Sequence, residues 1–157
     1  MPITLIITVY KDYEALERVL DSVCKQSMIP KQIILAHDAI DRTIHQTISQ
    51  FSSLLNITHI DQEDTGFNKN RILNKAILLS QADKLIFIDG DCILHPKFIA
   101  SHQSYINVGT YTAGRRLDLD PISSARIRKD GIRTINLFGL FRNKTKRVEE
   151  GIYFPGG

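Results

Sequence analysis

The fold class is decided by the stretch KLIFIDGD at residues 84–91. Its first five residues are mostly apolar, as in a strand that is buried on both faces of a parallel sheet. Two carboxylates, Asp89 and Asp91, follow at once and flank Gly90. A glycine here lets the backbone turn sharply and lets a ligand approach closely. The stretch predicts a central strand that ends in an acidic turn, although Asp-Gly-Asp is also a plain turn sequence.

Strand-like and helix-like segments alternate on both sides of this stretch. Apolar, β-branched runs predict further strands at 3–9, 33–36 and 56–60, each followed by apolar residues at helical spacing. Asp12 is a candidate N-cap of the first helix, and Pro96 is placed to begin a helix after the acidic turn. Residues 110–113 can add one more strand. This alternation predicts an α/β fold, with a mostly parallel sheet and helices on both faces.

The regular pattern ends near residue 114, so we expect a core over 1–114 and an extension over 115–157. Residues 115–147 carry ten Lys or Arg against three Asp and include the apolar cluster 135–141. We expect this basic segment to be irregular, with one or two helices. The chain closes on a loop-like Phe-Pro-Gly-Gly, from which we expect that a following part is missing.

Several classes of protein are excluded by what the sequence lacks. No window approaches the roughly 18 consecutive apolar residues that a membrane span needs, and no signal peptide is recognisable. Cys24 and Cys92 have no CxxC spacing, so neither a structural zinc site nor a disulfide framework is expected. We therefore expect a cytoplasmic protein. The basic charge of 115–147 lacks the interleaved aromatic residues or motifs of a nucleic-acid-binding surface.

Polar side chains stand at the carboxyl end of every predicted strand. They are Thr8 and Tyr10, Asp38, Asp61 with Glu63 and Asp64, and Asp89 with Asp91. In an open parallel sheet these ends form one edge, where ligands bind. Carboxylates gathered there repel one another unless a cation neutralises them, and a hard divalent ion with oxygen ligands would do so. Such an ion can bridge phosphate oxygens and stabilise a diphosphate leaving group.

Five ordered motifs now carry a resemblance to a known family. They are IITVY at 6–10, AHD at 36–38, QEDTGF at 62–67, NKAI at 74–77 and FIDGDC at 87–92. They resemble the inverting family 2 glycosyltransferases, above all the branch with a galactosyltransferase-like or chondroitin-polymerase-like N-terminal half. The resemblance covers about residues 3–116. It implies a GT-A, Rossmann-like fold in which 1–114 is the nucleotide-sugar-binding core, truncated before the acceptor-binding half.

The resemblance also implies roles for single residues. Thr8 and Tyr10 would line the nucleotide pocket, and Asp38 would bind a uracil-type base. Glu63, Asp64 and Asn74 would border the nucleotide and the sugar. Asp89 would lie near the ribose or sugar and beside the metal, and Asp91 would be the metal ligand. The implied cofactor is Mn²⁺ or Mg²⁺, and the implied donor is a nucleotide sugar, with UDP-sugars favoured.

The chain departs from the family pattern at several positions. His37 stands where the family has the first acid of an Asp-Asp pair, and Leu73 stands where an Arg is common. Lys69 or Arg71 could supply the replacement charge to the diphosphate. The family's general base lies in the acceptor-binding half, and the late pair Glu149-Glu150 is not expected to replace it. We therefore expect the 157-residue chain to bind nucleotide sugar weakly and to transfer sugar poorly or not at all.

Other interpretations remain open. Tyr10 could pack at its strand end, Asp38 could cap the following helix, and Glu63 and Asp64 could be solvated. The chain could be an inactive nucleotide-sugar-binding module. A sugar-1-phosphate nucleotidyltransferase is disfavoured, because the first strand is followed by no glycine-rich loop. A haloacid-type phosphatase is disfavoured by the short remainder after Asp91. No histidine is assigned a catalytic role.

The expected partners follow from the family and from the basic segment. The acceptor would be a saccharide or a lipid-linked sugar. Residues 115–147 could contact anionic lipid, placing the protein peripherally at the inner face of the membrane. They could instead pack on the missing half, which would leave the cluster 135–141 exposed and favour self-association.

Overall fold

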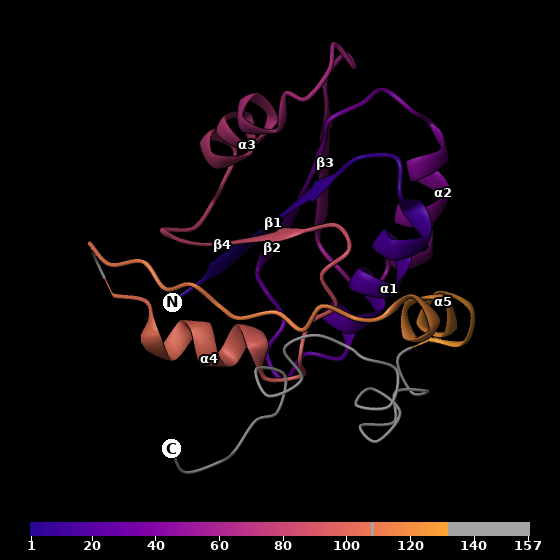
Figure 1. Cartoon of the computed structure of the whole chain (residues 1–157). Coiled ribbons are helices and arrows are strands. Elements are labelled where there is room, and N and C mark those ends of the chain that lie inside the picture. The colour runs from indigo at the N-terminus through magenta and orange to yellow at the C-terminus, as the bar shows by residue number, and fades with distance from the viewer. Residues whose placement is uncertain (108, 132–157) are drawn as a thin grey trace. The chain divides into compact units, whose positions relative to one another are not determined.

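The computed structural model describes residues 1–107 and 109–131. It separates into two compact units, Met1–Tyr111 and Thr112–Gly157, and each is described by itself. The first unit is built on a four-stranded parallel sheet in the order β3-β2-β1-β4 (Figure 1). The strands are β1 (Ile3–Val9), β2 (Gln32–His37), β3 (Ile57–Asp61) and β4 (Lys84–Asp89). The predicted parallel sheet is confirmed, with all four predicted strands present.

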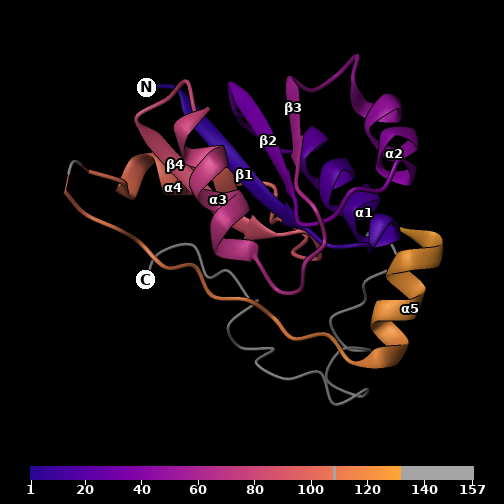
Figure 2. The ribbon, with the colours of Figure 1, turned by 90° about the horizontal axis from the view of Figure 1, so that it is seen from above.

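Helices cover both faces of this sheet (Figure 2). One face packs against α1 (Tyr13–Cys24), α2 (Thr43–Phe51) and α4 (Phe98–Tyr105) through a large apolar core that includes Leu16, Ile44 and Ile99. The other face packs against α3 (Lys69–Leu78), which buries Ile72 and Ala76. The α/β fold with helices on both faces is thus confirmed.

The alternation of side chains along β1 explains the two cores. Leu5 and Ile7 belong to the larger core and Ile6 to the smaller one, because successive side chains of a strand point to opposite faces. All three side chains are fully buried. Strand β1 lies between β2 and β4, so it has no edge that could be left in water.

Local sequence signals set the start of α1. The Asp12 carboxylate accepts a hydrogen bond from the backbone N–H of Ala15 at 3.1 Å, which confirms the predicted N-cap. None of the helices in the described residues is long and apolar enough to cross a membrane.

The helix predicted after the acidic turn is present as α4, but it begins at Phe98, two residues after Pro96. The Pro96 carbonyl accepts a hydrogen bond from Ser27 N–H at 2.8 Å. The further strand predicted after this helix is wrong. Residues 110–113 form no strand. There the backbone N–H of Thr110 bonds the carbonyl of Asn107 at 3.1 Å, so the chain closes a local turn instead of extending along the sheet.

The described part of the second unit contains α5 (Pro121–Asp130). Asp120 caps this helix by accepting from the N–H groups of Ile122 and Ser123, and Pro121 occupies the first turn. A helix in the basic segment was expected. The cluster 135–141 and the pair Glu149-Glu150 lie outside the described residues.

Candidate functional site

The polar residues predicted at the strand ends share one edge of the sheet, because all four strands run in the same direction. The register pairs Thr8 of β1 with Asp89 of β4, and His37 of β2 with Asp61 of β3. Asp38 follows β2 directly, and its N–H bonds the carbonyl of Val9 at 2.9 Å. The carboxyl ends of β1, β2, β3 and β4 thus form a continuous rim of polar groups.

Strands β1 and β4 are joined at this rim by side chain and backbone. The Thr8 hydroxyl donates to Asp89 Oδ1 at 3.0 Å, and the Gly90 N–H donates to the Thr8 carbonyl at 2.8 Å. A Cβ at position 90 would lie 2.9 Å from that carbonyl oxygen. A glycine is therefore required here by the close approach of the β1 backbone, whereas the sequence suggests a turn and the close approach of a ligand.

The acidic turn after β4 offers a compact set of metal-binding atoms. One ligand atom each from Asp89, Asp91 and Cys92 can be chosen so that all lie within 4.8 Å of one another. Burial raises the pKa of the Cys92 thiol, and the two aspartates supply carboxylate oxygens as donors. Carboxylate oxygens suit Mg²⁺ and Mn²⁺. The residues present therefore fit a hard divalent ion.

A cation from α3 reaches the same turn. The Lys69 ammonium forms an ion pair with Asp89 Oδ1, the oxygen that also accepts from Thr8. Of the two cations considered from the sequence, the structure brings Lys69 to the rim. Arg71 is exposed.

Asp38 is a buried carboxylate that organises the loop before α3. Its Oδ1 accepts from the Gln62 amide at 2.6 Å, and its Oδ2 accepts from the backbone N–H of Asn68 at 3.0 Å. Gln62 also donates to the Asn68 carbonyl at 3.0 Å. Asp38 does not cap α2, whose N-cap is Arg42. The alternative that Asp38 caps the following helix is therefore wrong. Asp38 instead bonds Asn68, which is the N-cap of α3.

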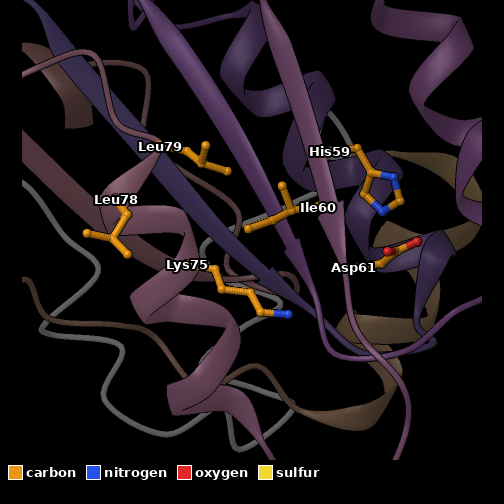
Figure 3. Close-up of a pocket in the computed structure, with 6 residues that line it drawn as sticks. All are labelled: His59, Ile60, Asp61, Lys75, Leu78 and Leu79. Atoms are coloured by element: carbon orange, nitrogen blue, oxygen red, sulfur yellow. The ribbon is translucent and has the colours of Figure 1, made fainter.

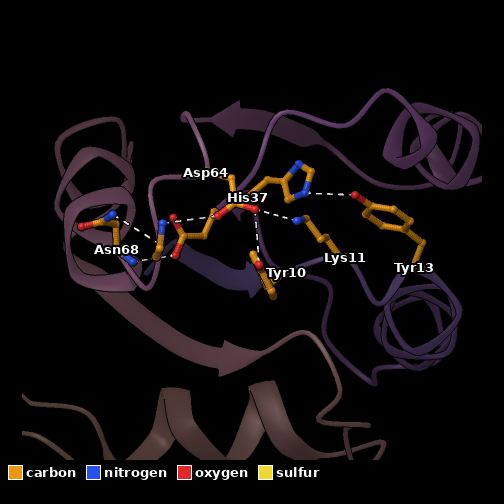
Figure 4. Close-up of polar contacts among 8 residues, drawn as sticks. Tyr10, Lys11, Tyr13, His37, Asp64 and Asn68 are labelled. Atoms are coloured by element: carbon orange, nitrogen blue, oxygen red, sulfur yellow. Dashed lines mark hydrogen bonds and ion pairs between the residues drawn. The ribbon is translucent and has the colours of Figure 1, made fainter.

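Tyr10, Lys11 and Asp64 form a clasp between the loop after β1 and the loop after β3 (Figure 4). Asp64 Oδ2 accepts from the Tyr10 hydroxyl at 3.3 Å and from the Lys11 ammonium at 2.5 Å. The hydrogen bond between Lys11 and Asp64 lowers the pKa of the Asp64 carboxyl and raises the pKa of the Lys11 ammonium. Lys11 has a positive φ of 53°, which is uncommon for a residue with a Cβ. The sequence analysis missed Lys11.

A histidine cluster lies beneath the rim on the α1 and α2 face, and the sequence analysis missed it too. His37 Nε2 is 3.2 Å from the Tyr13 hydroxyl (Figure 4). The His37 and His59 rings are 5.6 Å apart, and the His59 and His45 rings 5.3 Å. Burial lowers the pKa of both His37 and His59. Strand register could have revealed the pair, because His59 is level with Leu35 and so shares the face of His37.

Glu63 and Asn74 are not drawn into these contacts. Both are exposed, Glu63 in the loop after β3 and Asn74 in the second turn of α3. The loop and helix positions match the prediction, but within residues 1–107 and 109–131 no hydrogen bond or ion pair joins either side chain to the rim.

A shallow groove runs between α3 and the edge strand β3 (Figure 3). It is lined by His59, Ile60, Asp61, Lys75, Leu78 and Leu79. Lys75 comes from α3 and lies on the same side of the sheet as Ile60, whereas His59 and Asp61 point to the other side. The groove is separate from the acidic turn after β4, which lies at the opposite edge of the sheet.

Comparison with known proteins gives a consistent picture. The model of the family "Glycosyl transferase family 2" matches residues 4–155. Chondroitin synthase of Escherichia coli is 24% identical over 107 residues, which are 68% of this chain and 16% of that protein. The chain thus spans about a sixth of the length of this curated relative.

Two solved structures show the same fold. A crystal structure of S. aureus TarS matches with a TM-score of 0.60 and 16% identity, over 77% of this chain and 24% of that one. A mannosyltransferase from Pyrobaculum calidifontis, in complex with GDP-Man and Mn²⁺, matches with a TM-score of 0.55 and 19% identity. That match covers 71% of this chain and 33% of the mannosyltransferase.

Proposed function

The chain belongs to glycosyl transferase family 2, and from this premise we propose that its rim binds a UDP-sugar together with Mn²⁺ or Mg²⁺. The observation that carries the proposal is the acidic turn. Asp89 and Asp91 present carboxylate oxygens close together at the carboxyl end of β4, in the place where parallel α/β sheets bind ligands. The bound ion would supply charge neutralisation of the diphosphate as it leaves.

Structural relatives support a nucleotide sugar as the ligand. The mannosyltransferase was crystallised with GDP-Man and Mn²⁺. Residues 1–349 of TarS were crystallised with UDP-GlcNAc, and that structure matches this chain with a TM-score of 0.51 and 17% identity. The choice of uracil rests on the role that the family resemblance gives Asp38, and a carboxylate that accepts two hydrogen bonds keeps lone pairs for the N–H of a base.

Each residue at the rim has a proposed task. Tyr10, which is 57% exposed, would offer its ring to the base. Thr8 would hold Asp89 in place through the hydrogen bond to Oδ1. Asp91, exposed at the tip of the turn, would coordinate the ion. Glu63, Asp64 and Asn74 would border the nucleotide and sugar from the loop and helix that follow β3.

We further propose transfer with inversion to a saccharide or lipid-linked acceptor. The acceptor oxygen would form a bond to the anomeric carbon as the bond to the diphosphate breaks, and a carboxylate would take the hydroxyl proton. We propose that this carboxylate comes from an acceptor-binding part beyond the core 1–114. We also propose that the protein is cytoplasmic and that residues 115–147 contact anionic lipid.

Titration calorimetry tests the binding proposal directly. UDP is titrated into the protein with Mn²⁺ and without it, for the natural chain, for Asp91→Asn and for the control Asp83→Asn. Asp83 is exposed and precedes β4, so it lies at the opposite end of the same strand. We expect Mn²⁺ to strengthen UDP binding. In Asp91→Asn the UDP affinity measured with Mn²⁺ should fall by more than about tenfold, since even changes to residues around the metal ligands cost about 10–100-fold in metal affinity.

The same titration separates the alternatives. Binding of a nucleoside triphosphate in preference to UDP would support a nucleotidyltransferase. Metal-dependent UDP binding without turnover of UDP-sugars on a broad acceptor panel would support a binding module. A UDP affinity that changes neither on adding Mn²⁺ nor in Asp91→Asn would refute the metal site.

A further inference from the structure

We propose that Lys69 is a diphosphate-binding residue that changes partner during ligand binding. Its ammonium forms an ion pair with the Asp89 carboxylate. When a divalent ion takes Asp89, the ammonium moves to the diphosphate. This inference rests on the proposed function and adds to it a second cation and an order of exchange.

The ion pair places Lys69 on the carboxylate of Asp89, one of the candidate metal-binding residues. Lys69 and Thr8 both donate to Asp89 Oδ1, and Asp89 is one of the residues whose oxygens cluster at the acidic turn. An ammonium and a divalent cation repel each other, so binding of the ion at the Asp89 carboxylate weakens the hold of Lys69 on it. Lys69 therefore competes with the ion for Asp89 in the absence of nucleotide.

The pair is built to exchange. The side chains of Lys69 and Asp89 are 33% and 44% exposed, and an exposed ion pair contributes little to stability. The ammonium sits on a flexible four-carbon stem. Displacement from Asp89 therefore costs little and needs no movement of the backbone.

The displaced ammonium remains beside the position proposed for the diphosphate. Lys69 is the first residue of α3, so its backbone lies at the rim and its side-chain ammonium reaches Asp89 in the turn after β4. The positive end of the helix dipole also lies there and favours an anion. Lys11, the other rim lysine with a described ion pair, is held by Asp64 across the clasp.

A purely structural ion pair would behave differently. If Lys69 only tied α3 to β4, its removal would not tighten the binding of a metal ion. Under partner exchange, removal has two effects of opposite sign: the ion alone binds more tightly, because its competitor is gone, and the diphosphate binds more weakly, because a cation is lost.

The test compares Lys69→Met with Lys69→Arg and with the matched control Lys75→Met. Lys75 is on the same helix but lines the groove beside β3. Free Mn²⁺ is measured by its EPR signal with protein alone, and UDP and UMP binding are measured at saturating Mn²⁺. Thermal midpoints verify that each variant is folded.

We expect Lys69→Met to bind Mn²⁺ alone a few-fold more tightly and to lose about tenfold in UDP affinity, with a smaller loss for UMP. Lys69→Arg should keep most of the preference for UDP over UMP, and Lys75→Met should match the natural chain. Unchanged or weaker Mn²⁺ binding in Lys69→Met would refute the exchange. An unchanged preference for UDP over UMP would refute the diphosphate contact. If the natural chain binds no UDP, the proposed function fails, and the Mn²⁺ measurement still decides whether Lys69 competes for Asp89.

Discussion

The Asp38 carboxylate, which follows β2, accepts a hydrogen bond from the backbone N–H of Asn68, the N-cap of α3. Thirty residues separate the two in sequence. Through this bond a buried acid at one strand end fixes the start of the helix that carries Lys69. The residue expected to recognise the base thus also shapes the neighbouring part of the site.

Asp38→Asn should loosen the loop before α3. An amide must turn one NH₂ donor toward either the Gln62 amide or the Asn68 N–H, and a buried hydrogen bond lost in this way costs about 1–3 kcal/mol. Hydrogen exchange should show faster exchange at Asn68 and in the first turn of α3, together with a lower stability to urea. Asp61→Asn, at the exposed end of β3, serves as the control. Unchanged exchange at Asn68 would show that Asp38 does not hold the loop.

Gly90→Ala should weaken metal binding through sterics alone. The new Cβ would lie 2.9 Å from the Thr8 carbonyl oxygen, so the ends of β1 and β4 must separate. Overpacking of this kind typically costs about 1–3 kcal/mol. We expect a lower thermal midpoint and weaker Mn²⁺ binding by EPR.

Gly66→Ala is the matched comparison for Gly90→Ala. Gly66 has a φ of +100° but open space around the Cβ position, so alanine there strains the backbone without touching the acidic turn. Its thermal midpoint should fall while Mn²⁺ binding stays unchanged. Equal Mn²⁺ binding by the natural chain and Gly90→Ala would contradict the steric argument.

The buried histidines should make stability depend on pH. Burial lowers the pKa of His37 and His59, so the folded protein keeps both neutral when the unfolded chain, with a histidine pKa of about 6.5, has bound protons. The stability they contribute is present above about pH 6.5 and is lost as the pH falls from there through the lower folded-state pKa. Each site adds a slope of at most about 1.4 kcal/mol per pH unit.

Urea unfolding at pH 7.5, 6.5 and 5.5 measures this slope. The double variant His37→Gln, His59→Gln should show a shallower loss of stability toward acid than the natural chain. A double variant that loses stability as steeply as the natural chain would rule the pair out as its source.

Lys11→Met should return the Asp64 side chain toward ordinary acidity. The hydrogen bond from Lys11 is the main cause that lowers the Asp64 pKa, so its loss should raise that pKa. Carboxyl carbon shifts followed by NMR during a pH titration give the value directly. An Asp64 pKa that does not rise in the variant would show that the clasp between the two loops does not form in solution.

The sequence by itself determined the sheet. The strands at 3–9 and 84–88 are mostly apolar, interrupted only by Thr4 and Thr8 in the first and by Lys84 at the start of the second, and such runs are typical of a strand covered on both faces. The cap at Asp12 was likewise predictable, because it depends on neighbours in the chain. Family membership followed from motif order, which survives at low identity.

Only the tertiary structure decided which polar groups meet at the rim. Lys69 and Arg71 were equivalent candidates in the sequence, but the orientation of α3 brings the Lys69 ammonium to Asp89. Asp38 bonds Asn68, the N-cap of α3, and does not cap the helix that follows it. The Pro96 carbonyl bonds Ser27, a residue 69 positions earlier in the chain. Apolar periodicity reports which face of an element is buried, whereas a hydrogen bond between distant segments depends on how the elements pack, and a one-dimensional pattern does not encode that packing.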